Sequence, residues 1–417
     1  MEERAGLFRV LKNTNFLALW IGQIISQFGD RLAQMALVGL FLKQTAGISL
    51  SHSVPIMRNL FFFSTLPIVL FSPLAGVYID RWSRKATLVV ADFLRAGLIL
   101  LIPFLAVYLK GIAYIYGVIF LVFTVTCFFT PAKSAIIPNL VKKGNLVAAN
   151  SLSNITRMIA MIGGISAGGV IVAWLEIRMS FYLDSLTFLL SGLAILTIRI
   201  KESLPADPPL EKAGVGLKKV MRELIEGLEF IKREKRVSFV TLSLFVLMAA
   251  SGMGYLLITV FITKALGLGT VGLSVFAVFL GVGMAAGALL YGQFGEHIGR
   301  EIVILGGSFI AGGCALLLGG SKSFLILSLA IGIIGFVASP IVTAAYTLIQ
   351  EMTPDRIRGR VFSALEVVIN ASFLLFLCLG GILAAKFPIE NIFYFTGVGL
   401  LVYAGGFLLL RFSKGWL

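Results

Sequence analysis

Seven charged side chains lie inside long apolar stretches of this sequence. A charge in hydrocarbon costs about 2.5–3.5 kcal/mol on insertion scales, so each of them needs a partner or a function. Asp30, in the segment SQFGDRL, lies about half-way along its stretch. A carboxylate there can accept a proton or pair with a cation, which predicts a role in proton coupling or substrate binding. The alternative is a salt bridge to Arg31 or Arg157 that holds helices together.

Arg157 and Glu366 are further candidates for proton coupling or substrate binding. Arg157 could meet an anionic substrate, tune Asp30, or extend to the cytoplasmic interface. Glu366 is the one acidic residue within an apolar stretch of the second half, and it could pair with the arginines of RIRGR (356–360) or lie in a cavity. The polar residues that could line a cavity, or form interhelical hydrogen bonds instead, are Gln23, Gln27, Gln34, Asn154 and Asn370.

Three charged residues favour structural roles. Asp92 and Arg95 are three residues apart and therefore share one helix face. They lie close in sequence to a charged loop at 80–85, so we predict an ion-pair network with that loop. Asp184 lies four residues into its apolar stretch, which predicts a carboxylate at the membrane interface.

The charged loop occurs twice. GVYIDRWSRK (76–85) and GQFGEHIGRE (292–301) align at a constant offset of 216 residues. A carboxylate and an arginine four residues later can pair with each other or with the end of a neighbouring helix. Such a charge clasp can form in one state and break in another; the alternative is ordinary loop charge. The predicted clasp comprises Gly76, Asp80, Arg81, Arg84, Asp92, Arg95, Glu296 and Arg300.

The composition explains where these residues must lie. The 417 residues are 58% hydrophobic and 13% charged, whereas soluble domains are about 45–50% apolar and about 25% charged. The net charge of +15 could suggest nucleic acid, but the basic residues lie in short loops, as the positive-inside rule describes. The three cysteines lie in apolar runs and predict no disulfide framework, and we expect no cleavable signal peptide.

Twelve stretches are long enough to span a membrane as helices. Placing the N-terminus inside puts 25 Lys and Arg residues in the inner segments and 7 in the outer loops. We therefore expect both termini in the cytoplasm. The expected spans are 15–42, 56–79, 87–109, 112–130, 146–174, 180–198, 237–263, 270–293, 302–320, 323–349, 361–385 and 391–410.

One hydrophilic segment, 199–236, separates six spans from six. The predicted organisation is a six-helix half at 1–198, a cytoplasmic linker at 199–236, and a second half at 237–417. Apolar residues recur every three or four positions after Leu217, which predicts a basic amphipathic helix that either lies on the membrane surface or only tethers the halves. An even number of spans in each copy gives the halves the same orientation, related by an axis along the membrane normal.

With twelve spans, a long central loop and G-x-x-x-D-R-x-x-R-K after span two, the chain resembles the major facilitator superfamily over its whole length. NTNFLALWIGQIISQFGDRL, ADFLRAG, TPAKSAIIPNLV and RIRGRVFSAL resemble the branch of macrolide efflux proteins and the enterobactin exporter. Ser83 replaces a family glycine, and Gly163-Gly164 and Gly168-Gly169 stand where antiporters carry Gly-Pro.

The resemblance implies an all-α, two-half transporter of the inner membrane that works by alternating access and is a monomer. We expect proton-coupled efflux of amphiphilic or hydrophobic molecules, with no cofactor and no bound metal. PAKSAI and LVAANSL also resemble a lysophospholipid flippase of the same superfamily, which would use no proton. A metal exporter or a membrane enzyme is less favoured, because His52 and His297 lie in loops.

Overall fold

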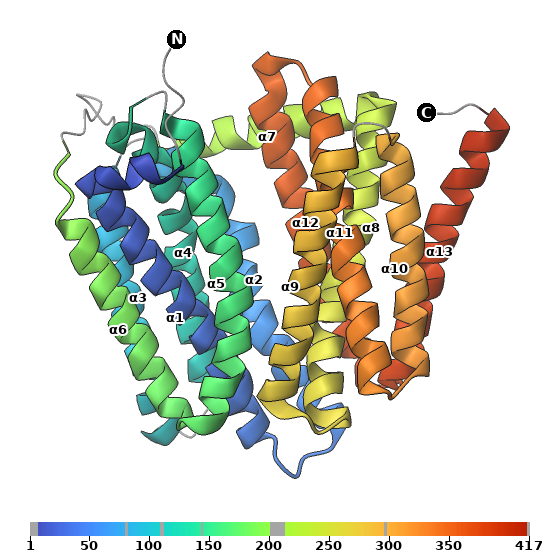
Figure 1. The fold of residues 1–417 in the computed structure, drawn as a ribbon, viewed down its shortest axis with the longest axis horizontal. Helices are drawn as coiled ribbons and strands as arrows, with labels where there is room; N and C mark the ends of the chain where they lie inside the picture. Colours follow the sequence, from blue (N-terminus) through green and yellow to red (C-terminus); the bar gives the residue numbers. More distant parts are fainter. Residues whose placement is uncertain are drawn as a thin grey trace. The chain divides into compact units, whose positions relative to one another are not determined.

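The computed structural model describes residues 7–79, 82–108, 112–142, 145–200, 213–295 and 298–414, and these residues form helices and their connections without a strand. Figure 1 shows the long helices as two groups. The helices of the first half are α1 (Thr14–Gln44), α2 (Leu50–Ile79), α3 (Arg84–Tyr108), α4 (Ile112–Leu140), α5 (Leu146–Trp174) and α6 (Ile177–Leu196), preceded by a short 3₁₀ helix at Leu7–Lys12. The helices that follow are α7 (Ala213–Arg233), α8 (Lys235–Val260), the π-helical turn η4 (Phe261–Ala265), α9 (Gly269–Phe294), α10 (Arg300–Gly320), α11 (Phe324–Met352), α12 (Asp355–Ala384) and α13 (Ile389–Lys414).

Each expected span overlaps one of these helices, but only ten helices in the described residues are long and apolar enough to cross a membrane: α2, α3, α4, α6 and α8–α13. The helix α1 is not among them, and in α5 only a shorter apolar stretch, Gly163–Trp174, is found. The expected count of twelve spans is therefore not confirmed. The prediction of an all-helical integral membrane protein is confirmed.

The chain divides into two compact units. One unit comprises Met1–Gln44 and Phe63–Leu217, and the other comprises Thr45–Phe62 and Lys218–Leu417. The first turns of α2 thus group with the helices of the second half. Lys264 of η4 donates hydrogen bonds to the Thr45 carbonyl oxygen at 2.7 Å and to Ser53 Oγ at 2.6 Å. The ring of Phe61 also packs on Tyr255 of α8, with 4.5 Å between ring centroids.

Helix packing follows the internal repeat in three places. The pairs α1–α5, α3–α4 and α3–α6 in the first half correspond to α8–α12, α10–α11 and α10–α13 in the second. Other pairs differ between the halves, because α1 packs closely on α6 whereas α9 packs closely on α11. The shared pairs occur at the positions that an internal repeat of six helices would place together.

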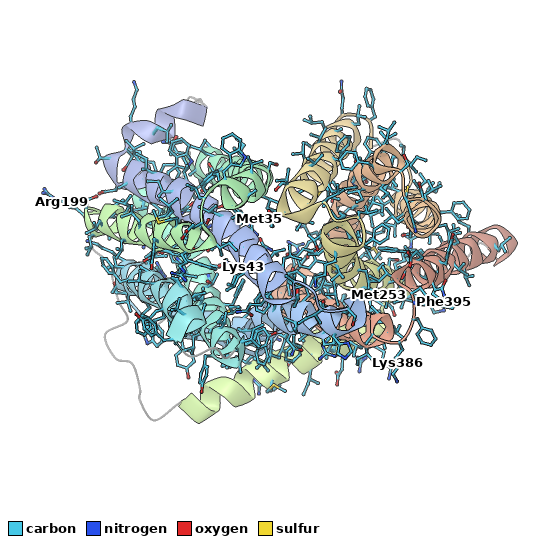
Figure 2. All side chains as sticks on the ribbon, turned by 90° about the horizontal axis from the view of Figure 1, so that it is seen from below. Met35, Lys43, Arg199, Met253, Lys386 and Phe395 are labelled. Atoms are coloured by element: carbon cyan, nitrogen blue, oxygen red, sulfur yellow. The ribbon has the colours of Figure 1, made fainter. Side chains whose placement is uncertain are left out.

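Glycines set the closest helix approaches, as is usual between membrane helices. A Cβ atom at Gly287 of α9 would lie 2.0 Å from the Phe336 carbonyl oxygen of α11. A Cβ at Gly252 of α8 would lie 2.2 Å from the Phe373 carbonyl oxygen of α12. Met253, labelled in Figure 2, packs against another glycine of α12, Gly380. The backbones of these helices touch, so larger residues at these glycines would push the helices apart.

The amphipathic helix expected in the linker is α7. Figure 1 shows it running across the direction of α8–α13. Gly227 of α7 packs directly on the backbone of α12, where its Cβ would lie 2.3 Å from the Arg360 carbonyl oxygen. Glu226 forms an ion pair with Arg360 beside that contact. Ile231 is buried, whereas Met221 and Leu228, two other members of the predicted apolar face, are exposed.

Candidate functional site

The close contact between α1 and α6 positions the most polar part of the first unit. A Cβ atom at Gly22 of α1 would lie 3.0 Å from Ser191 Oγ of α6. A Cβ at Gly29 would lie 2.0 Å from Thr187 Oγ1 and 2.4 Å from Asp184 Oδ1. Because glycine occupies both positions, α6 lies directly against α1, and its polar side chains face the segment that contains Asp30.

Asp184 is fully buried at this contact, with 0% of its surface exposed. Its Oδ1 accepts a hydrogen bond from Thr187 Oγ1 at 3.2 Å. Its Oδ2 accepts none from the residues that the structure describes. The prediction of an interfacial carboxylate was therefore wrong: the side chain points between helices, because Gly29 leaves room for it there.

Asp92 and Arg95 of α3 form a buried ion pair, with exposures of 0% and 2%. The guanidinium carbon of Arg95 lies 4.1 Å from the centre of the Phe129 ring and 4.3 Å from that of the Phe188 ring. The guanidinium is thus held between two aromatic faces, an arrangement that stabilises a desolvated cation. The spacing of three residues correctly predicted a shared face. The network with the loop at Asp80 lies outside the described residues.

Asp30 lies half-way along α1 and is partly exposed. Its charge interacts with those of Arg95, Arg31 and Lys133, and with that of Asp184. We call Asp30, Asp92, Arg95 and Asp184 the first-half charge cluster. The three carboxyl groups of this cluster all interact with the charge of Arg95, which already forms an ion pair with Asp92.

Other polar residues of α1 border the cluster. Arg31 donates a hydrogen bond from Nη1 to Gln34 Oε1 at 3.0 Å, and its stem packs on Gly164 of α5. Gln23 is buried, and neither polar atom of its side chain has a hydrogen-bond partner among the described residues. The Nε2 of Gln27 is in the same situation. Gln34 thus binds within its own helix, whereas Gln23 and Gln27 keep hydrogen-bonding capacity in the interior of the unit.

In the second unit, Glu366 is exposed and accepts a hydrogen bond from the Tyr346 hydroxyl of α11 at 2.6 Å. Asn370 Nδ2 donates to the Glu366 carbonyl oxygen at 2.8 Å and to its Oε2 at 3.3 Å. Of the RIRGR arginines, Arg360 pairs with Glu226 and Arg358 donates to the Thr353 carbonyl oxygen. In the structure, the recorded partners of Glu366 are thus Tyr346 and Asn370 rather than these arginines.

The repeated loop is described in part. Arg300, the first residue of α10, forms a bidentate ion pair with Glu351 near the end of α11, one contact of which measures 2.6 Å. Of the two pairings predicted for this arginine, the structure therefore shows the one to a neighbouring helix end. Gly76 lies in α2 and Arg84 begins α3. The residues outside the described part are Asp80, Arg81 and Glu296, together with the side chains of Asn154 and Arg157 on α5.

Sequence reasoning missed three partners: Thr187, Tyr346 and Glu351. Tyr346 and Glu351 lie on α11, the helix next in the chain to the helix of each partner. Tyr346 is 20 residues from Glu366 and Glu351 is 51 residues from Arg300, separations at which no helix spacing indicates a contact. In the described residues, no group of three or more His, Cys, Asp or Glu side chains is arranged to hold a metal ion. The first-half charge cluster consists of carboxyl groups and one guanidinium, which are groups that can bind protons or pair with a charged molecule.

A family model described as transmembrane secretion effector matches residues 5–415. The chain belongs to this family. It is 25% identical over 399 residues to the MFS-type transporter YkuC of Bacillus subtilis, covering 94% of this chain and 91% of that protein. It is 24% identical over 398 residues to macrolide efflux protein A of Streptococcus pyogenes, covering 93% and 94%.

Solved structures agree on the fold. The crystal structure of the nucleoside transporter NupG matches with a TM-score of 0.71 at 16% identity, over 96% of this chain and 100% of that one. The protein is a transporter of the major facilitator superfamily, in its efflux branch, and not an enzyme. The resemblance noted in the sequence is thereby confirmed.

Proposed function

We propose that the protein exports amphiphilic or hydrophobic small molecules in exchange for protons, by alternating access. The supporting observation is Asp30, a partly exposed carboxylate half-way along α1 whose charge interacts with Asp184 and with the buried Arg95. A site that exchanges protons needs both access and a charge environment that favours two protonation states. The similarity to macrolide efflux protein A supports export as the direction.

The energy for export comes from the proton gradient in this proposal. A proton that crosses the membrane releases about 2.3 kcal/mol per 100 mV of membrane potential. Protonation of Asp30 removes its attraction to Arg95 and Arg31, which frees the halves to move. When Asp30 releases the proton on the inside, the carboxylate restores these interactions and accepts a cationic or polar group of the next substrate.

The other candidate residues also have roles in the proposed transport cycle. Arg157 tunes the charge at Asp30, and Glu366 contributes a carboxylate from the second half to the substrate. The polar residues Gln23, Gln27, Gln34, Asn154 and Asn370 line the path. The ion pair of Arg300 with Glu351 forms in one state and opens in another. The transporter acts as a monomer in the bacterial inner membrane, with both termini in the cytoplasm.

Transport into inside-out membrane vesicles tests the proposal. The vesicles are given a fluorescent amphiphilic cation, a labelled macrolide or a labelled lysophospholipid, each with and without a proton gradient. Gradient-dependent accumulation of the cation or macrolide, abolished by an uncoupler, is the expected result. Movement of the lysophospholipid alone, independent of the gradient, would replace the exporter by a lipid flippase.

A further inference from the structure

Asp184 is a buried carboxyl group that the proposed cycle leaves without a task. It has no exposed surface. Thr187 Oγ1 binds its Oδ1, and no described residue donates to its Oδ2. Among the described residues, an ionised Asp184 has no ion-pair partner and few of the hydrogen bonds that normally compensate the burial of a carboxylate. The neutral acid, by contrast, suits this position.

The charges that face Asp184 come from each helix packed around it. On α1, Asp30 repels it, and on α3, Arg95 attracts it. Arg95 is already paired with Asp92. Arg31, also on α1, donates to Gln34. Lys133 of α4 acts on Asp30, and Arg157 of α5 has its side chain outside the described residues.

Two carboxyl groups that interact in a buried site do not ionise independently, because the first negative charge opposes the second. Arg31 and Lys133 act on Asp30, whereas the cation that acts on Asp184 is Arg95, which is already paired with Asp92. Asp184 is therefore the member of the pair that is less able to carry a negative charge. Asp30 is the more accessible of the two. It is therefore the member that exchanges with solvent.

We propose that Asp184 is a second proton-binding carboxyl group of this transporter, and that it keeps its proton while Asp30 binds and releases the transported one. The pair holds one proton when Asp30 is ionised and two when it is neutral, so one proton is taken up and one released in each cycle. This inference rests on the proposed role of Asp30 in coupling.

Infrared difference spectroscopy of the purified full-length protein in phosphatidylcholine vesicles tests the inference without a substrate. The C=O stretching band of a protonated carboxyl group reports a neutral Asp or Glu side chain. We expect a band at neutral pH in the wild type that disappears in Asp184→Asn. In Asp30→Asn the band should persist at neutral pH, but raising the pH should remove it at a lower pH than in the wild type.

The direction of that shift is decisive. Repulsion from ionised Asp30 favours the protonated form of Asp184, so removing the charge makes Asp184 easier to ionise. The expected result in Asp30→Asn is therefore loss of the band at a lower pH than in the wild type. An unchanged spectrum in Asp184→Asn, or an unchanged titration in Asp30→Asn, would overturn the inference.

Two further variants test whether the infrared band belongs to Asp184. Glu176→Gln neutralises an exposed carboxylate just before α6 and should leave the band unchanged. Thr187→Val removes the hydroxyl that binds Asp184 and should shift the band frequency, which remains measurable if Asp184→Asn does not fold. A band assigned to Asp184 in a protein without proton-driven transport would reject the proposed function and leave Asp184 only as a buried, protonated carboxyl group. Proton-driven transport in a protein that lacks the band would reject the inference on Asp184 and support the proposed function.

Discussion

The buried pair of Asp92 and Arg95 permits a quantitative test of what stabilises the first unit. Replacing Asp92 by Asn keeps the shape of the side chain but leaves the guanidinium without an anion. Arginine does not lose its proton in proteins, so the charge of Arg95 remains. It would then be a cation with 2% exposure and without its ion-pair partner, packed against the rings of Phe129 and Phe188.

The expected magnitude follows from that burial. Removing one partner of a buried pair costs about 3–5 kcal/mol, and the two ring contacts at 4.1 and 4.3 Å remain in Asp92→Asn, so we expect the lower end, about 3 kcal/mol. Arg95→Met should cost less, because Asp92 can become neutral by binding a proton. The double variant should resemble Arg95→Met, so the coupling energy should equal the cost of Asp92→Asn, about 3 kcal/mol.

The assay is reversible unfolding of the purified protein in mixed micelles with increasing denaturing detergent, for the wild type, both single variants and the double variant. The matched control is the same cycle on Arg222 and Glu226 of α7, an ion pair at 3.8 Å with exposures of 73% and 41%. Exposed pairs of this kind couple by about 0.2–1 kcal/mol. A coupling energy for Asp92 and Arg95 no larger than that for Arg222 and Glu226 would show that burial does not strengthen this ion pair.

Three further predictions follow from single contacts. Gly287→Ala should lower the thermal unfolding temperature, because its Cβ would lie 2.0 Å from a backbone oxygen, whereas Gly292→Ala, with nothing within 4 Å, should not; equal melting temperatures would contradict this. Arg300→Gln and Glu351→Gln should change the transport rate alike, and the double variant should be no worse than either single one, since they form one pair; additive effects would show that the residues act separately. Glu366→Gln should raise the KM for a cationic substrate while proton-driven accumulation persists, because its carboxylate is exposed beside Tyr346; loss of accumulation at saturating substrate would instead assign the coupling to Glu366.

The sequence predicted the helices well because ten of the expected spans correspond to helices that are long and apolar throughout. The amphipathic helix α7 was also visible from its periodicity, and Asp92 and Arg95 from their spacing of three. These are local properties, fixed by residues within a few turns of one another. Helix α1 is not among the helices apolar enough to cross a membrane, because Asp30, Arg31 and several glutamines stand where apolar residues would otherwise be. The same residues make it the helix that carries the candidate site.

Contacts between helices could not be read in the same way. The burial of Asp184 depends on Gly29, which lies 155 positions earlier in the chain, and no spacing rule connects them. The contact of Glu366 with Asn370 lies within one helix, so it could be predicted from spacing. Asn370 is four residues later and shares its helix face, whereas Arg360 is six residues earlier and faces elsewhere. Helix geometry alone therefore indicated Asn370 as a neighbour and argued against Arg360.

The central claim, that Asp30 couples proton movement to export, is tested most directly in proteoliposomes carrying Asp30→Asn. Counterflow, the exchange of labelled for unlabelled substrate without a gradient, requires alternating access but no proton. We expect Asp30→Asn to keep counterflow and to lose gradient-driven accumulation, and Asp30→Glu to keep both. Accumulation at the wild-type level in Asp30→Asn would show that Asp30 does not couple protons to export.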